Sequence, residues 1–407
     1  MGKMLSFRLI LFGLIVLLDT YVFFVLRSVT QHFSSVMRNA LLITHCALSL
    51  ATILLLFSVE HIHGTIRYYI FSILMGVIIA KVIMVIFFLL DDSRRAVAWS
   101  AKKIRHTQGD ELIISRSAFL SWLGLTLGTV FFGSILLGIT NRYNYRIIRQ
   151  RIKFPHLPPS FQGLRIVHIS DIHCGSFNNT GAVARGIEMI MQQKPDLILF
   201  TGDLVNDRAI ELKNYKQIFA KLKAPLGVYS ILGNHDYGDY HQWNSPREKQ
   251  KNLEDLKNIQ KEMGWRLLMN EHVVFERNGD NIALIGIENW SAKARFPKYG
   301  RLSQAYAGTE QMPFKILMSH DPSHWDAQVN TQYKDIDLTL SGHTHGMQFG
   351  VEIGRLRWSP VQYVYNKWGG KYTKGNQVLY VNRGFGFLGY MGRVGIKPEI
   401  TVIELER

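Results

Sequence analysis

The stretch Leu164–Gly175, LRIVHISDIHCG, decides the fold of the C-terminal two-thirds of this chain. A run rich in Ile and Val that is bounded by turn residues is typical of a buried parallel strand, so we predict a strand at Leu164–Ile169. Asp171 and His173 follow it, and a carboxylate and an imidazole two residues apart at a strand exit are able to bind one metal ion. Alone, this pair is more typical of an ordinary capped turn, so its meaning depends on the other strands.

Beyond this stretch, strands alternate with helices along the chain. Strands are predicted at Asp196–Phe200, Val228–Leu232, Val273–Phe275, Ile282–Ile287, Phe314–Met318 and Leu338–Leu340. Helices are predicted at Ala182–Gln193, Ile210–Leu222 and Leu253–Met263. This alternation indicates an α/β layered domain with a largely parallel sheet.

Four of the later strands also end in polar residues. They are followed by Gly202-Asp203, by Gly233-Asn234-His235-Asp236, by Ser319-His320 and by Gly342-His343-Thr344-His345. Ligands of open α/β sheets bind outside the carboxyl ends of the strands, so these side chains are expected to lie together. The glycines that precede Asp203, Asn234 and His343 permit the tight turns that such a layout needs.

This mixture of imidazoles, carboxylates and an amide favours Mn, Fe or Zn over Ca. Two divalent ions in one site stabilise both the attacking and the leaving oxygen of a phosphoryl transfer, and they lower the pKa of bound water. Asp203 is the natural bridge between two ions, because aspartate has two acceptor oxygens. His235, beside Asn234, is the candidate that protonates the leaving oxygen.

Other residues near these motifs have plainer interpretations. His168 lies within the first strand and is expected to be a core histidine, while His272 and His324 are expected on the surface or on helices. His241 has at most a supporting role in the site. Cys174 is expected to be a small buried filler, and with only two cysteines in the chain no disulfide framework is implied.

The N-terminal third has a different character. Four apolar runs, each long enough to cross a hydrocarbon core, occur at Leu5–Leu26, Ala40–Val59, Tyr69–Leu90 and Ala118–Thr140. Residues 1–140 are therefore predicted to form an all-α membrane region, residues 141–160 a basic, proline-containing linker, and residues 161–407 the α/β domain. Basic residues in the linker suit lipid headgroups.

Three ionisable residues lie inside the apolar runs: Asp19, His45 and Lys81. Such groups are costly at membrane depth, and they either pair with one another or line a pathway. An interhelical structural pair is favoured here over a transport relay.

The net charge of +16 indicates phosphate-bearing or membrane-surface partners without choosing between them. The positive-inside rule does not decide the orientation, because the loop before the fourth run and the segment after it are both basic. The motif Ser115-Arg116-Ser117-Ala118-Phe119-Leu120 resembles a degenerate twin-arginine export signal. This favours an integral protein of a bacterial plasma membrane with the α/β domain on the non-cytoplasmic face.

The motifs D-x-H, G-D, G-N-H-D, an upstream histidine and G-H-T-H occur here in the order found in calcineurin-like metallophosphoesterases, and the chain resembles that superfamily over Leu164–Glu406. The resemblance implies a four-layer α/β/β/α sandwich with two metal ions. It assigns one metal to Asp171, His173, Asp203 and His345, and the other to Asp203, Asn234, His320 and His343. It makes His235 the leaving-group acid, oriented by Asp236 or a neighbour.

The finer resemblance is to the membrane-linked YkuE/YaeI-like branch, through Ser-Asp-Ile-His, Gly-His-Thr-His-Gly-x-Gln and a tail with Asn382-Arg383-Gly384 and Arg393. Some relatives in that branch cleave the pyrophosphate of UDP-2,3-diacylglucosamine. Met347, where the branch often has glycine, and the three additional spans depart from the pattern.

The stretch Phe349–Tyr372 mixes aromatic and basic side chains. Such a mixture suits a membrane interface or a lipid phosphate, and equally an ordinary structural aromatic cluster. Nucleic acid is disfavoured, because a membrane-tethered domain seldom meets it. Trp358 and Trp368 of this stretch, with Arg383, are the candidate substrate-binding residues.

The sequence thus predicts a membrane-anchored dimetal enzyme that hydrolyses phosphodiester or pyrophosphate bonds, with a lipid-linked or nucleotide-sugar substrate. The alternatives are a membrane receptor or scaffold whose phosphoesterase-like domain only binds a ligand, and a transporter with a regulatory domain of this kind.

Overall fold

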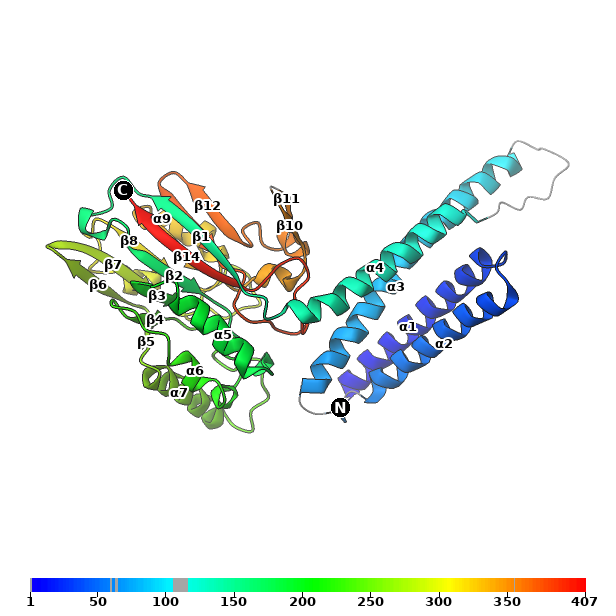
Figure 1. The fold of residues 1–407 in the computed structure, drawn as a ribbon, viewed down its shortest axis with the longest axis horizontal. Helices are drawn as coiled ribbons and strands as arrows, with labels where there is room; N and C mark the ends of the chain where they lie inside the picture. Colours follow the sequence, from blue (N-terminus) through cyan, green and yellow to red (C-terminus); the bar gives the residue numbers. More distant parts are fainter. Residues whose placement is uncertain (1, 59–60, 63–64, 105–115, 355) are drawn as a thin grey trace. The chain divides into compact units, whose positions relative to one another are not determined.

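The computed structural model describes residues 2–58, 61–62, 65–104, 116–354 and 356–407, so Ser115, the first residue of the export-like motif, lies outside the described residues. The chain divides into two compact units, Met1–Leu137 and Gly138–Arg407 (Figure 1). Each unit has its own hydrophobic core. We therefore describe them separately.

Helices make up the first unit. They are α1 (Gly2–Val29), α2 (Ser35–Ser58), α3 (Thr65–Ile104) and α4 (Ala118–Asn141), of which the last turn of α4 belongs to the second unit. All four are long and apolar enough to cross a membrane, as the four apolar runs predict. At 1.5 Å per residue the 40 residues of α3 extend about 60 Å, so this helix is longer than the ~30 Å hydrocarbon core requires.

The three ionisable residues inside the apolar runs, Asp19, His45 and Lys81, meet between the helices of the first unit. Lys81 of α3 forms an ion pair with Asp19 of α1, and both side chains are about nine-tenths buried. The imidazole of His45 on α2 donates to the Asp19 carbonyl at 3.0 Å, and Lys81 Nζ lies 3.5 Å from Ser49 Oγ. A buried pair of opposite charges between helices is the structural arrangement that the sequence favours.

Two six-stranded sheets form the second unit. The first has the order β1-β14-β2-β3-β4-β5, with bounds Arg146–Lys153, Glu399–Glu406, Arg165–Ile169, Leu197–Phe200, Val228–Ser230 and Arg266–Leu267. The second has the order β12-β13-β9-β8-β7-β6, with bounds Gly370–Lys374, Gln377–Val381, Leu338–Ser341, Lys315–Met318, Asp280–Gly286 and Glu271–Arg277. A separate hairpin joins β10 (Val351–Ile353) to β11 (Leu356–Trp358).

Helices that lie wholly in the second unit are short, apart from α5 and α7. The α-helices are α5 (Thr180–Met191), α6 (Lys216–Phe219), α7 (Pro246–Glu262), α8 (Leu302–Tyr306) and α9 (Asn330–Gln332). Single helical turns are η1 (Pro159–Phe161), η2 (Cys174–Ser176), η3 (Ala209–Leu212), η4 (Trp325–Val329), η5 (His345–Gln348) and η6 (Pro360–Tyr363). The helix expected at Ile210–Leu222 is therefore two pieces, η3 and α6.

The strand pairings explain where the site lies. Strands β2, β3, β4 and β5 run parallel, and so do β7, β8, β9 and β13, whereas β6 and β12 are antiparallel edges of the second sheet. The largely parallel arrangement follows the prediction. Parallel strands bring their carboxyl ends to one edge, where the polar motifs are concentrated.

The two sheets pack face to face. Ile166 and Leu199 of the first sheet share one buried cluster with Leu284, Ile316 and Leu340 of the second. Because side chains alternate along a strand, Leu317 points to the opposite face, into a cluster with Leu302 and Trp325 from α8 and η4.

On the outer side of the first sheet, helix α5 buries Val183, Ile187 and Ile190, and Figure 1 shows α5, α6 and α7 beside β2–β5. The layers are thus α/β/β/α, as the resemblance implies.

One part of the predicted organisation differs. The segment 141–160, predicted to be a linker, contains β1, whose eight residues pair in parallel with β14 from Arg146↔Glu399 to Lys153↔Glu406. Its basic residues look like linker composition, but charge on an edge strand also prevents pairing with another sheet.

Candidate metal centre

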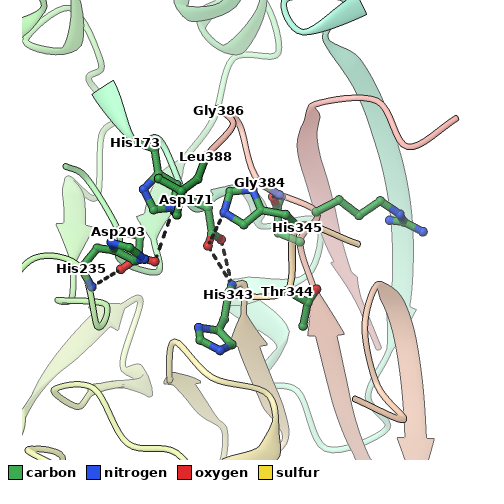
Figure 2. Close-up of polar contacts among 12 residues, drawn as sticks. Asp171, His173, Asp203, His235, His343, Thr344, His345, Gly384, Gly386 and Leu388 are labelled. Atoms are coloured by element: carbon green, nitrogen blue, oxygen red, sulfur yellow. Dashed lines mark hydrogen bonds and ion pairs between the residues drawn. The ribbon is translucent and has the colours of Figure 1, made fainter. Parts of the chain in front are cut away.

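Five strand ends bring their polar residues to one place. Asp171 and His173 follow β2, Asp203 follows β3, Asn234 follows β4, His320 follows β8, and His343 and His345 follow β9. Figure 2 shows Asp171, His173, Asp203, His235, His343 and His345 close together, with dashed lines from Asp171 to His343 and from Asp203 to His173 and His235. All seven predicted metal ligands lie in this cluster.

Within the cluster, two groups have metal-ligand geometry. Asp171, His173 and His345 form one group and Asp203, His320 and His343 the other, with the donor atoms of each group within 4.8 Å of one another. Asp203 links the groups, because its Oδ2 lies 3.5 Å from His173 Nε2 and 3.2 Å from His320 Nε2.

The amide of Asn234 completes the second group. Its Oδ1 lies 2.9 Å from His343 Nδ1, and its Nδ2 donates to the hydroxyl of Tyr240 at 3.0 Å. Tyr240 thereby turns the amide so that oxygen, the atom that ligates metals, faces the cluster.

These residues fit two divalent cations. Among the described residues, Nε2 of His173 and Nε2 of His345 are buried and have no hydrogen-bond partner. A buried polar atom without a partner costs about 1–3 kcal/mol, and a metal ion supplies the missing partner. His320 donates from Nδ1 to the Thr201 carbonyl at 2.7 Å, which leaves its Nε2 available as a ligand.

The electrostatics of the site also favour bound cations. Burial raises the pKa of Asp171 to about 6, and the neighbouring Asp203 carboxylate contributes to that rise. Burial lowers the pKa of His320, but the carboxylates of Asp203 and Asp171 outweigh it and raise that pKa to about 10. Two buried carboxylates thus need a positive charge, which bound cations supply.

The backbone around the ligands is strained. Asp171, His173, Asp203, His343 and His345 have φ angles of 52°, 48°, 60°, 71° and 50°. Left-handed backbone is uncommon for residues other than glycine and costs roughly 1–3 kcal/mol each, and such strain clusters at functional sites.

Close approach holds this strained backbone in place. The His343 amide donates to both carboxylate oxygens of Asp171, each at 2.9 Å. A Cβ on the preceding Gly342 would lie 2.1 Å from Asp171 Oδ2, so only glycine permits this contact.

His235 lies beside the first group, with its ring centroid 4.9 Å from that of His173. The resemblance has Asp236 or a neighbour orient His235, and in the structure Asp236 is not the group that contacts the ring. The carbonyl of Asn206 accepts from His235 Nδ1 at 2.7 Å, whereas the Asp236 carboxylate faces the backbone.

The amides that donate to Asp236 belong to Asp203, Leu204, Val205 and Gly233. Asp236 is thus a positioning residue for the turn that carries Asp203. Burial and the neighbouring Asp203 carboxylate raise its pKa to about 7, and the amides of Gly233, Val205 and Leu204 oppose that rise.

The predicted substrate-binding residues are placed differently from the metal ligands. Arg383 is buried, with Nη1 2.6 Å from Glu399 Oε2 and Nη2 2.5 Å from Glu352 Oε1. Trp368 is buried, and the guanidinium groups of Arg357 and Arg383 lie 5.2 and 5.9 Å from its ring centroid. Arg383 and Trp368 therefore stabilise the structure around the site. The guanidinium of Arg383 is paired with two glutamates and the ring of Trp368 contacts two guanidinium groups, so neither is available to a substrate.

Trp358 ends β11 and is about one-third exposed, on a hairpin whose Arg355 lies outside the described residues. Met347 is exposed and has a positive φ of 55°, which glycine would adopt without strain.

Three histidine expectations are also settled by the structure. His168 is buried and hydrogen-bonds to Thr201 Oγ1 at 2.9 Å, as expected of a core histidine. His324, expected on the surface or a helix, is fully buried between Ser319 Oγ at 2.9 Å and Gln328 Oε1 at 2.8 Å. His272 lies on edge strand β6 and hydrogen-bonds to the Ala305 carbonyl at 3.0 Å.

Two residues of the site were not predicted. The Tyr365 hydroxyl lies 2.8 Å from His343 Nε2 and 3.1 Å from Asp321 Oδ2, so it fixes the side of the imidazole that faces away from Asn234. Arg393 is fully buried, and Nη1 donates to the carbonyls of His345 and Arg383 at 3.2 and 2.7 Å. Tyr365 was noted only as part of an aromatic stretch and Arg393 only as part of a motif.

A four-layer α/β/β/α domain with carboxylates, imidazoles and one amide at its strand ends defines a dimetal phosphoesterase-type domain. The family model of the calcineurin-like phosphoesterase matches residues 164–347, and that of the probable calcineurin-like phosphoesterase, transmembrane domain, matches residues 4–142. The chain belongs to the calcineurin-like phosphoesterase family and is an integral membrane protein.

Individual relatives agree with this assignment. The metallophosphoesterase YkuE of Bacillus subtilis is 31% identical over 261 residues, 63% of this chain and 83% of that protein. The transmembrane protein with metallophosphoesterase domain of Danio rerio is 33% identical over 272 residues, 64% of this chain but only 57% of that protein. The phosphodiesterase YaeI of Escherichia coli is 27% identical over 301 residues, 72% of this chain and 100% of that protein.

Proposed function

We propose that the protein is a membrane-anchored dimetal hydrolase of phosphodiester or pyrophosphate bonds. The observation that carries this proposal is the pair of ligand groups joined by Asp203, in which the buried Nε2 atoms of His173 and His345 face carboxylates at 3.5 and 3.3 Å but have no hydrogen-bond partner among the described residues. Asp171, His173, Asp203 and His345 would hold one ion, and Asp203, Asn234, His320 and His343 the other, with Mn, Fe or Zn as the metal.

When bound, the two ions polarise the phosphoryl oxygens and lower the pKa of coordinated water. The protein supplies the geometry and a proton. The Asn206 carbonyl accepts a hydrogen bond from Nδ1 of His235. Nε2 of His235 is therefore the nitrogen that gives a proton to the leaving oxygen. Asp236 keeps the Asp203 turn in its strained conformation through four amide hydrogen bonds.

For the substrate we propose a lipid-linked or nucleotide-sugar phosphodiester or pyrophosphate, of which UDP-2,3-diacylglucosamine is one type. Four membrane helices on the same chain support this class, because they hold the domain near a bilayer. The printed name of the relative YaeI, phosphodiesterase, supports the reaction type. A ligand-binding receptor would not need the full ligand set, and the Lys81–Asp19 ion pair already accounts for the charges that motivated a transporter.

Sidedness belongs to the same proposal. We place the domain on the non-cytoplasmic face of a bacterial plasma membrane, supported by the export-like residues around Arg116 and Ser117. An alkaline phosphatase fused after Arg407 should be active in this orientation. An active cytoplasmic reporter at that position would instead place the domain in the cytoplasm.

Metal removal tests the hydrolase proposal. The full chain, purified in detergent, should hydrolyse bis(4-nitrophenyl) phosphate in the presence of manganese. Activity should be lost after dialysis against EDTA and restored by Mn²⁺, because four imidazoles and two buried carboxylates would lose their cation partners. Folded protein with two bound metals per chain and no hydrolysis of this diester or of UDP-glucose would contradict the proposal.

Replacing His235 with asparagine should lower kcat by about 10²–10⁴-fold for a phosphodiester with an alkyl leaving group, because proton donation contributes that much. The loss should be much smaller for bis(4-nitrophenyl) phosphate, whose nitrophenolate leaves without a proton. Metal content, measured by mass spectrometry, should stay at two per chain. An equal loss with both leaving groups would show that His235 does not act as the acid.

A further inference from the structure

The small hairpin of the catalytic domain has one apolar and one charged face. Strands β10 and β11 pair antiparallel in the register Val351↔Trp358, Glu352↔Arg357 and Ile353↔Leu356. Because successive side chains of a strand point to opposite faces, the first and third pairs share one face and the charged pair occupies the other. We name the apolar side the hairpin face, and it consists of Val351, Ile353, Leu356 and Trp358.

The charged face of this hairpin, rather than the apolar one, packs on the domain. The carboxylate of Glu352 is largely buried, and its Oε1 accepts from Nε of the buried Arg383 at 3.0 Å. By contrast, Ile353 and Leu356 are 73% and 62% exposed. An antiparallel pair normally packs its apolar face on the core and leaves the polar face to water, so this hairpin is inverted.

The turn that follows the hairpin enlarges the exposed apolar surface. Tyr363, at the end of η6, and the adjoining Val364 are both exposed. The Tyr363 hydroxyl accepts a hydrogen bond from the indole of Trp358, which joins the turn to the hairpin face. Exposed apolar side chains that are gathered in one surface mark an interaction site.

The base of the hairpin lies beside the last turn of α4, which belongs to the second unit. Phe349 bridges to Val394, and the Gly350 amide donates to the Val394 carbonyl at 2.9 Å. Val394 lies against Gly138 of α4, where a Cβ would be 2.6 Å from Val394 Cγ2. Because α4 is long and apolar enough to cross a membrane and ends within one turn of Gly138, the base of the hairpin is close to the membrane surface.

Exposed lysines adjoin the hairpin. Lys371 follows Gly370, which lies beside the guanidinium of Arg357, and Lys397 follows Ile396, which lies beside the base of the hairpin at Gly350. Lysines at the edge of an apolar surface attract anionic lipid headgroups.

We infer that the hairpin face, together with Tyr363 and Val364, inserts into the headgroup region of the bilayer that holds the membrane helices. Aromatic and aliphatic side chains with lysines at their edge are the composition of an interfacial segment. The position of the hairpin beside the end of α4 favours the bilayer over a second copy of the chain as the partner. Tyr365 directly follows Val364 and contacts His343 at 2.8 Å, so this surface continues to the metal centre. Lipid contact of this kind requires no particular reaction at that centre.

The test uses the full chain in nanodiscs of phosphatidylcholine and phosphatidylglycerol. Cys46 is replaced with serine and Cys174 is buried, so a cysteine introduced by Leu356→Cys takes up an NBD fluorophore. Its emission should shift to the blue, and doxyl-labelled lipids should quench it about twofold or more, because an interfacial segment lies ~5–10 Å deep in the headgroup and acyl boundary. Ile353→Cys should give the same result from the opposite strand.

Val274→Cys is the matched control, because Val274 is an exposed apolar residue on β6, at the edge of the second sheet opposite β12. A label there should keep the emission of a water-exposed probe and be quenched little. Labels at Leu356 and Ile353 that are quenched no more than the label at Val274 overturn the inference. A blue shift without quenching by lipid, accompanied by crosslinks between two chains at Leu356→Cys, also overturns it, because a second copy then covers the surface.

Discussion

Replacing Asp203 with asparagine should lower kcat/KM for bis(4-nitrophenyl) phosphate by roughly a thousandfold or more. One carboxylate oxygen of Asp203 reaches an imidazole in each ligand group, at 3.5 Å for His173 and 3.2 Å for His320. Asparagine has no negative charge, and when its oxygen accepts from the His235 backbone its NH2 group, which does not ligate metals, takes the place of Oδ2 between the two groups. Losing one ion removes several kcal/mol of transition-state stabilisation, and each 1.36 kcal/mol corresponds to a factor of ten.

Asparagine is the informative substitution because it preserves the local structure. Asp203 has a φ of 60°, a conformation that asparagine tolerates. The amide oxygen can still accept from the His235 backbone, which donates to Asp203 Oδ1 at 2.9 Å. The metal content should fall from two to at most one per chain. Asp255→Asn on the exposed face of α7 is the control and should keep both metals and full activity. More than a tenth of the activity in Asp203→Asn would rule out a bridging role.

The metal ligands were predictable because each follows a strand within a few residues. A short apolar run fixes where a strand ends, and a parallel sheet brings the ends of its own strands to one edge, so Asp171 lies near Asp203, and His320 near His343, before any contact is known. Local sequence thus carries the spatial information within each sheet, and the family resemblance implied that the two sheets join their ligands in one site.

The rest of the site depends on contacts between distant segments. Tyr365 reaches His343 across 22 residues, and Arg383 is neutralised by Glu352, 31 residues away. Nothing local distinguishes an arginine that binds substrate from one that pairs with a buried and a partly buried glutamate. Edge strand β1 was missed for a related reason, because pairing with β14, at the far end of the domain, makes a basic segment into a strand.

Replacing Arg383 with methionine should destabilise the catalytic domain by about 3–5 kcal/mol, because removal of one partner leaves a buried charge unpaired. Glu399 is fully buried, and Arg383 lies 2.6 Å from its Oε2. Burial raises the pKa of Glu399, but Arg383 and the hydroxyls of Thr401 and Tyr380 outweigh this effect and lower the pKa below its usual value. The carboxylate is therefore charged in the native protein. Without the guanidinium, this charge and that of Glu352 keep only weaker partners.

Arg151→Met is the matched control for this loss, because Arg151 also lies near two glutamates, Glu404 at 3.9 Å and Glu406 at 3.7 Å, but its side chain is 74% exposed. Exposed pairs contribute about 0–1 kcal/mol. In thermal unfolding of the full chain followed by tryptophan fluorescence, Arg383→Met should lower the Tm of the catalytic domain by roughly 6 °C or more, and Arg151→Met by about 2 °C or less. If Arg383 bound substrate instead, its replacement would leave that Tm unchanged and raise KM, and the assignment to an ion-pair network would be wrong.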